Sequence, residues 1–309
     1  MKKILVTVLC LAAVFCGRLS AQVSQYSVDL AQFSDIDVSG PFEVSIVRGS
    51  QYRALITVLD PYKEYVVCNV GAGKLTLTLD ERKVPAEVKR QFRGKGTPDP
   101  VFKAIVYVPE LLQSVKLSGK AVMQDTEDLF DKARITFVLE DNASVRALYL
   151  SSLVFKLDMK GKSSAEFVVT SRETVVNLAG TANLKLEDES EDCIYTLVGS
   201  SKARVKSNTR SLTLSAKSNS SMTLVGSGDG ATFELAGTSE VDASQFELSD
   251  ADVRMSSVTR LSVAVDNVLR VNLNGGSTLL FSGDPSVSID NIRSATMTRL
   301  QTKGGSTKL

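Results

Sequence analysis

The sequence predicts an all-β protein whose main body is a parallel β-solenoid, or β-helix, of about ten coils. Three observations support this fold class. Apolar residues recur roughly every nineteen residues, small turn-forming residues recur between them at the same interval, and apolar and polar residues alternate on either side. A near-constant period of this length is typical of repeat architectures. We expect a right-handed coil with a β-rich cap at its N-terminal end.

Three apolar columns run through residues 115–300. The first consists of Leu117, Leu139, Met159, Leu178, Leu197, Ala216, Leu235, Met255, Leu273 and Ile292. The second lies two residues earlier and consists of Val115, Phe137, Leu157, Val176, Tyr195, Leu214, Phe233, Val253, Val271 and then Asp290. The third lies six residues after the first and consists of Met123, Val145, Ala165, Leu184, Ala203, Met222, Val241, Leu261, Leu279 and then Thr298.

Two columns of small residues indicate a tight corner in each coil. Residues that favour turns lie two positions after the first column: Gly119, Asp141, Gly161, Gly180, Gly199, Ser218, Gly237, Ser257, Gly275 and Ser294. Small residues follow two positions later: Ala121, Ala143, Ser163, Ala182, Ser201, Ser220, Ser239, Thr259, Ser277 and Thr296. The spacing of two on either side predicts strands, so each coil reads as strand, corner, strand and return loop. Stacking then buries the apolar face that a single coil leaves exposed.

The first residues predict export. Lys2 and Lys3 precede the apolar run Ile4–Phe15, which is too short to span a bilayer and fits a signal peptide of residues 1–21, cleaved after Ala21. Lipidation at Cys16 is the alternative. The expected destination is the periplasm, the outer-membrane surface or the extracellular space. No later apolar run could cross a membrane.

Residues 22–112 predict a β-rich cap, residues 113–300 the repeats, and residues 301–309 a flexible tail. The alternating stretch Ile36–Ile46 has the spacing of a coil, with Val38, Gly40, Phe42 and Val44 matching Leu117, Gly119, Ala121 and Met123. A turn at residues 48–51 precedes further expected strands, which are Ala54–Leu59, Tyr65–Val70, Lys74–Leu79 and Val101–Val108. A terminal coil needs such a cap because its bare edge would aggregate.

Composition excludes several functions. Removing residues 1–21 leaves 33 basic and 35 acidic residues, a net charge of −2, so there is no basic surface for nucleic acid. The chain contains no histidine, which removes histidine-based nucleophilic catalysis and histidine-ligated metals. Cys68 and Cys193 could form a disulfide after export, but the inward parity of Cys193 favours a buried free thiol. No cofactor site is expected.

Carboxylates are the remaining route to catalysis, as in polysaccharide lyases or glycoside hydrolases. Such a pair would lie about 5–10 Å apart, on neighbouring coils. In the outward columns beside the corner no two acids are adjacent, and Asp158 and Glu166 share a coil but lie on different strands. The acidic stretch Glu187–Asp192 and the segment Asp125–Asp131 could bind Ca²⁺, but neither recurs one period away, so solvated loops without metal are favoured.

The stretch Phe33–Val58, FSDIDVSGPFEVSIVRGSQYRALITV, resembles the head-GIN-domain family of auto-transporter adhesins. The Gly-cornered repeats and the ending Ala295–Leu300 also fit, so the resemblance covers nearly the whole chain after residue 21. It implies an exported β-helical protein of Gram-negative bacteria, common in gut species, with no catalytic residues. The polar insertion Glu81–Pro100 departs from the family by being longer and more basic than expected.

We therefore expect a non-catalytic exported protein that adheres to a glycan or a cell-surface protein. The alternatives are a carbohydrate-active β-helix enzyme and a purely structural envelope protein. Interface energy is often concentrated in arginine and aromatic residues. The insertion gathers Arg90, Phe92 and Arg93, which are the candidate partner-binding residues, although a solvated hairpin or short helix would also explain it.

Overall fold

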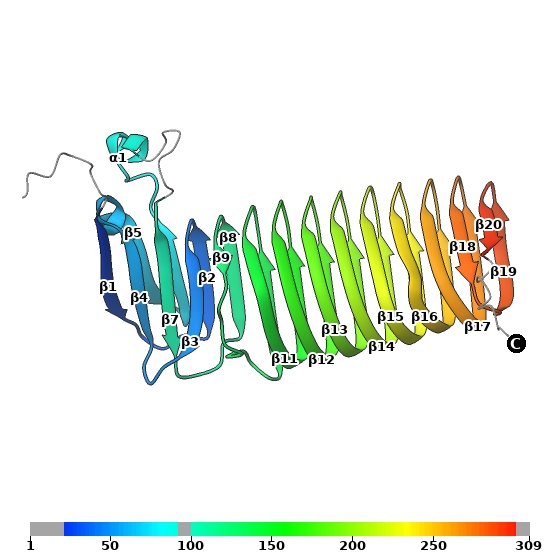
Figure 1. Ribbon diagram of the computed structural model, residues 1–309, viewed down its shortest axis with the longest axis horizontal. Coiled ribbons are helices and arrows are strands. Elements are labelled where there is room, and N and C mark those ends of the chain that lie inside the picture. The colour runs from blue at the N-terminus through cyan, green and yellow to red at the C-terminus, as the bar shows by residue number, and fades with distance from the viewer. Residues whose placement is uncertain (1–21, 92–99, 301–309) are drawn as a thin grey trace, which may run out of the picture.

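The structure is a computed structural model that describes residues 22–91 and 100–300. It is a long rod of stacked coils with a thicker end formed by the N-terminal residues (Figure 1). The strands pair in parallel along the rod, which confirms the predicted β-solenoid of about ten turns. The expected signal peptide and tail lie outside the described residues.

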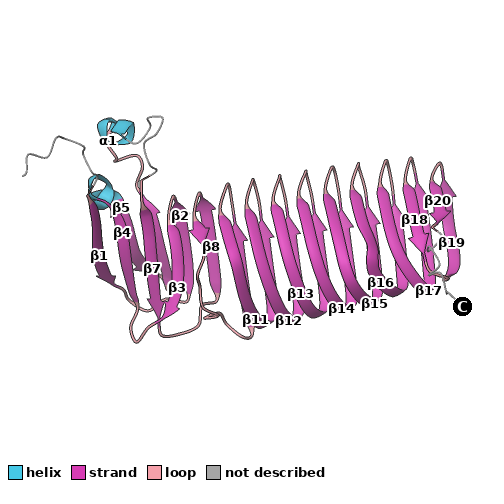
Figure 2. Ribbon diagram, viewed as in Figure 1, coloured by secondary structure: helices cyan, strands magenta, loops and turns pink. Residues whose placement is uncertain are grey.

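Seven long strands form the regular part of the rod, each paired in parallel with the next. They are β11 (Ser144–Met159), β12 (Ser164–Leu178), β13 (Asn183–Leu197), β14 (Lys202–Ala216), β15 (Ser221–Leu235), β16 (Glu240–Met255) and β17 (Arg260–Asn274). Each runs from one corner to the next without interruption. The corners are the short loops along one edge of the rod in Figure 2, whereas the strands themselves bend at the opposite edge.

The prediction of a return loop in each coil is therefore wrong for β11 to β17. Ser152, Ser171 and Ser190 lie at the bend and pair with one another in register from coil to coil. The parallel ladder continues on both sides of the bend and leaves only one or two residues unpaired there, as at Ser190 and Glu191 opposite β14, so the chain turns without leaving the sheet. Glu187–Asp192, which we expected to form a loop, lies inside β13.

The corners agree with the prediction. Gly180 and Gly199 have φ of +74° and +82°, and Asp141 and Ser218 adopt the same left-handed region with φ of 60° and 64°. Ala182 and the other small residues that follow the corner are buried from Ala121 to Ser277, whereas Thr296 in the last coil is exposed. The three apolar columns point inward and match in register through β17, for example Leu178 with Leu197.

The last coil departs from the predicted columns. It consists of β18 (Thr278–Ser282), β19 (Ser286–Arg293) and β20 (Thr296–Arg299). An irregularity in β19 places Ile289, rather than Asp290, opposite Val271. Pairing of β18 with β20 sets Met297, rather than Thr298, beside Leu279. The irregularity in β19 and the shorter repeat between Leu279 and Met297 place apolar residues in the columns. A fixed period does not predict these shifts.

The first coil stacks on a coil that lies far from it in sequence. The first coil contains β2 (Asp35–Gly40) and β3 (Glu43–Arg48). The second coil contains β8 (Ser114–Gly119) and β9 (Val122–Met123). The third coil begins with β10 (Arg134–Leu139), which pairs with β8. Val38 pairs with Leu117, Gly40 with Gly119 and Val44 with Met123, which confirms the predicted match of spacing.

The remaining strands extend the first coil on its other side. On one face β3 pairs with β7 (Phe102–Val108), which is followed by the antiparallel β4 (Arg53–Leu59) and β1 (Val23–Asp29). On the other face β2 pairs with β6 (Lys74–Leu79), followed by the antiparallel β5 (Val66–Gly71). The 3₁₀ helix η1 (Asp60–Tyr65) joins the two faces, and its buried Tyr62 packs edge-on against Phe102 at 5.1 Å. The expected strands of this region are confirmed.

Candidate functional site

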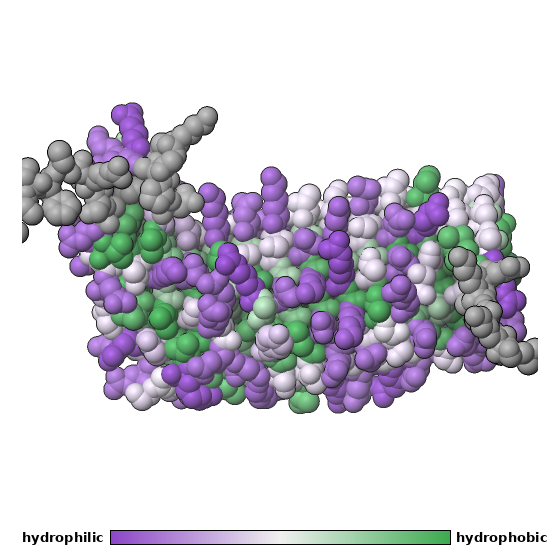
Figure 3. Space-filling view, in the orientation of Figure 1, coloured by the Kyte–Doolittle hydropathy of each residue, from purple (hydrophilic) through white to green (hydrophobic). Residues whose placement is uncertain are grey.

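The face of the rod in Figure 3 carries many polar side chains interspersed with apolar ones. Oppositely charged side chains on neighbouring strands form ion pairs, for example Lys185 with Glu166 at 2.5 Å and Arg254 with Glu234 at 3.2 Å. Asp158 lies on the other side of the corner from Glu166, where it accepts a hydrogen bond from Asn177 at 2.7 Å. The two acids thus bind separate neighbours on opposite sides of the corner.

One stretch of the interior is polar. Asp188 is 1% exposed and takes the column position that Val169 occupies in the preceding coil. Its carboxylate accepts hydrogen bonds from Thr174 at 3.0 Å, from Cys193 at 3.3 Å, and from the hydroxyls of Ser190 and Tyr195. Four donors offset much of the cost of burying a charge. The acidic stretch is therefore partly internal, which its charge pattern did not indicate.

The buried carboxylate of Asp188 contributes to raised pKa values of two neighbouring side chains. Burial, reinforced by the charge of Asp188, raises the pKa of Tyr195 well above its usual value. Burial likewise raises the pKa of the Cys193 thiol to about 11, with Asp188 again contributing. Cys193 and Cys68 are free thiols. These groups lie among core side chains, so the cluster is part of the packing of the rod and not a surface site.

The insertion contains the short helix α1 (Ala86–Gln91), which projects beside the N-terminal strands (Figure 1). Arg90 is exposed on this helix. Lys89 donates a hydrogen bond to the carbonyl oxygen of Glu81 at 2.5 Å, which ties the helix to the start of the insertion. Phe92 and Arg93, the other two candidate partner-binding residues, lie outside the described residues.

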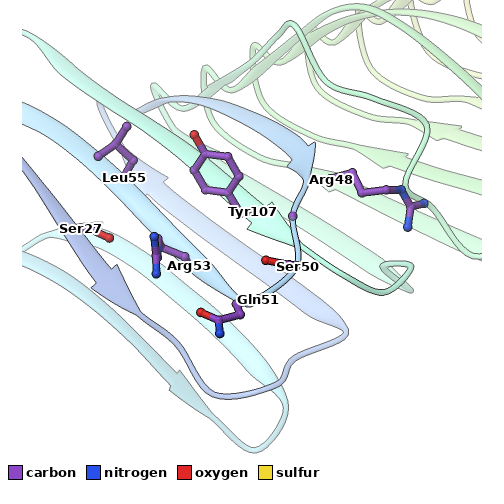
Figure 4. A pocket seen from close by; sticks show the side chains of 8 residues that line it. Ser27, Arg48, Ser50, Gln51, Arg53, Leu55 and Tyr107 are labelled. Atoms are coloured by element: carbon purple, nitrogen blue, oxygen red, sulfur yellow. The ribbon is translucent and has the colours of Figure 1, made fainter.

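A cleft of about 400 Å³ opens on the outer face of the cap (Figure 4). We call it the Tyr107 cleft. Its lining comes from β1, β3, β4, β7 and the β3–β4 loop, and consists of Ser27, Arg48, Gly49, Ser50, Gln51, Arg53, Leu55 and Tyr107. Antiparallel pairing of β4 with β7 sets Arg53 opposite Tyr107, and pairing of β1 with β4 sets Ser27 opposite Leu55.

Close packing of the loop shapes this cleft. A Cβ atom on Gly49 would lie 2.8 Å from the Cβ of Tyr107, so only glycine allows the loop to pass so near the base of the ring. Leu55 and the half-buried Tyr107 form an apolar wall, and Ser50, Gln51 and Arg53 lie below the ring in Figure 4. Sequence reasoning missed this site. The available signal was Tyr107 on the outward parity of its strand, close to a turn containing Gly49.

The polar groups of the cleft are largely uncommitted. Arg53 uses its Nε to donate to Asp29 at 3.0 Å. The hydroxyls of Ser27 and Tyr107 and the amide of Gln51 make no side-chain hydrogen bond to any described residue. Of the described residues that line the cleft, Arg48 and Arg53 are the charged ones.

No three histidine, cysteine or acidic residues cluster as a metal site would require within residues 22–91 and 100–300. Over the same ranges, no helix has the length and apolar character to cross a bilayer.

The fold defines a class, a parallel β-solenoid extended at one end by antiparallel strands. Within it, a family model described as "Putative auto-transporter adhesin, head GIN domain" matches residues 32–193 and 158–285, and the chain belongs to that family. Membership supports a surface, adhesin-like role and a surface or exported location.

Several solved structures are similar to this chain at low sequence identity. A protein described as a putative lipid binding protein from Parabacteroides distasonis ATCC 8503 is 18% identical, with a TM-score of 0.50. Putative adhesins from Parabacteroides distasonis ATCC 8503 and Parabacteroides merdae ATCC 43184 are 15% and 14% identical, each with a TM-score of 0.49. Each match covers 91% of this chain and 98% of the other. No match was found among curated proteins.

Proposed function

We propose that the chain is an exported, non-catalytic adhesion protein that binds glycans at a cell or matrix surface. The observation that carries this proposal is a long, internally packed rod with polar faces in a chain of the adhesin family. Such a rod presents an extended surface without needing to change shape. A carbohydrate-active enzyme is disfavoured because Asp158 and Glu166 are held by other partners on separate strands.

A glycan array tests the proposal with the full chain after residue 21. Retention of one or more glycans, with no new reducing ends released from polysaccharide substrates, is the expected result. An array with no retained glycan would refute glycan binding, and release of cleaved products would refute the non-catalytic assignment. Surface labelling of intact cells separates adhesion from a purely internal structural role, because an adhesin must be accessible from outside.

The insertion remains a proposed contact for an anionic ligand or partner. Its support is the exposed Arg90 on α1 and the basic residues around it in the sequence. Replacing residues 81–100 by a short Gly-Ser turn should weaken binding, and the loss should shrink as salt rises. Full binding by a folded replacement variant would place the contact elsewhere.

A further inference from the structure

The Tyr107 cleft combines features that a sugar-binding site needs. A half-buried aromatic ring and Leu55 form its apolar wall. Hydroxyls and an amide, from Ser27, Ser50 and Gln51, surround that wall without side-chain partners among the described residues. A sugar ring has an apolar face edged by hydroxyls, so it can pack on an aromatic ring while bonding to such groups.

Charge narrows the ligand class. Among the described residues no carboxylate lines the cleft, whereas the Arg53 side chain lies in it and Arg48 reaches it from the end of β3 with its guanidinium turned outward. Arg53 is tied to Asp29 only through its Nε, and Asp29 is 83% exposed, so this ion pair is weak. The two terminal nitrogens of Arg53 stay free, and a guanidinium binds a carboxylate with strong, directional hydrogen bonds.

We propose that the Tyr107 cleft binds a carboxylated sugar, with Arg53 holding the carboxylate and Tyr107 packing against the sugar ring. This inference rests on the proposed glycan-binding function and specifies its site and ligand class. The carboxylate could belong to a uronic acid of a plant or bacterial polysaccharide, or to a sialic acid of a host glycan. Both present one carboxylate on a hydroxylated ring.

Arg48 provides a matched control. Its guanidinium points away from the Tyr107 ring in Figure 4 and donates to the carbonyl oxygen of Pro109 at 3.3 Å. Arg53→Gln and Arg48→Gln each remove one positive charge from an exposed side chain of the same region. A difference between them therefore reports contact with the ligand rather than the general field of the surface.

The experiment is calorimetric titration of the chain after residue 21 with two acidic probes and their neutral partners. Tetragalacturonate is paired with its methyl ester, and 3′-sialyllactose with lactose. At least one acidic probe should bind about tenfold or more tightly than its neutral partner, and which one binds identifies the source of the sugar. Arg53→Gln should weaken that binding about tenfold or more because it removes a hydrogen bond between two charged groups. Tyr107→Ala should weaken it by a similar factor because it removes the aromatic ring that packs against the sugar. Arg48→Gln should change it no more than about twofold, because this side chain points away from the ring.

Two results would overturn the inference while leaving the proposed function in place. One is equal binding of the acid and its neutral partner. The other is unchanged binding in Arg53→Gln, an exposed substitution that should fold normally by circular dichroism. A chain that retains no glycan on the array and binds neither acidic probe would overturn both proposals together.

Discussion

The stacked corners allow a sharp test with two glycines that differ only in the space around them. Gly180 and Gly237 have φ of +74° and +79°, so alanine at either position would adopt a left-handed conformation, at about 1–2 kcal/mol. A Cβ on Gly180 would approach the backbone of Gly161 no closer than 3.0 Å. A Cβ on Gly237 would lie 2.8–2.9 Å from three backbone atoms of Ser218, which cannot move without disturbing the ladder.

Gly180→Ala should therefore lower the free energy of unfolding by about 1–2 kcal/mol from the backbone angle, plus a small packing cost from the tight contacts with Gly161. Gly237→Ala should lower it by about 2–5 kcal/mol, because overpacking against a fixed backbone adds about 1–3 kcal/mol. Urea unfolding followed by circular dichroism measures both, with the slope checked for a change in the unfolding mechanism. Equal losses in the two variants would show that the backbone angle alone matters and that the close contact at Gly237 carries no energy.

Four further predictions concern the interior. Ala182→Leu should cost about 1–3 kcal/mol of unfolding free energy, because this residue is fully buried in the narrow corner; an unchanged melting midpoint would contradict that packing. Ser201→Ala should leave the free energy of unfolding unchanged or raise it by up to about 1 kcal/mol, because the buried Ser201 hydroxyl has no hydrogen-bond partner. Ser239→Ala should lower it by about 1 kcal/mol, because the Ser239 hydroxyl donates to a carbonyl oxygen at 3.1 Å. The urea midpoints of the two variants should therefore differ. Burial raises the pKa of Cys193 from 9.0 to about 11, as it does for Cys68, so between those pH values the unfolded chain loses each proton and the folded chain keeps it. Cys193 should contribute up to about 3 kcal/mol to the fall in the free energy of unfolding across this window, and the fall should be smaller by about that amount in Cys193→Ala. EDTA should leave the melting temperature unchanged, since no metal-ligand cluster occurs within the described ranges, and a clear drop would reveal a site.

The period of the sequence was enough to predict most of the fold, because each coil buries side chains at the same positions of the repeat. Leu178, Leu197 and Ala216 sit above one another, so one apolar column predicts both the inward face and the register. The corner followed for the same reason, since Gly180 and Gly199 need a conformation that few residues tolerate. The bend was missed because strand and loop differ there only in backbone pairing, which leaves no distinct mark on the side chains.

Contacts between distant segments were harder to foresee. The Tyr107 cleft depends on antiparallel pairing of β1, β4 and β7, and no repeat relates Ser27, Arg53 and Tyr107 in the sequence. The interior position of Asp188 was hidden for a different reason. Four charged neighbours in the stretch Glu187–Asp192 and the assumption of a loop concealed that the Asp188 side chain points inward, toward Thr174 and Tyr195.

The place of the first coil has a consequence for how the chain can fold. Asp35 and Ser114 meet across 79 residues, whereas Ser171 and Ser190, on successive coils, meet across 19. Closing the longer loop costs about 1 kcal/mol more in chain entropy. Strands β2 and β3 also lie between partners that are all synthesised after them. A chain emerging from its N-terminus therefore leaves this coil incomplete until residues near 123 are available, while each later coil can add to one already formed. The slow step of folding should be assembly of the cap with the first coil, and growth of the rod should follow it.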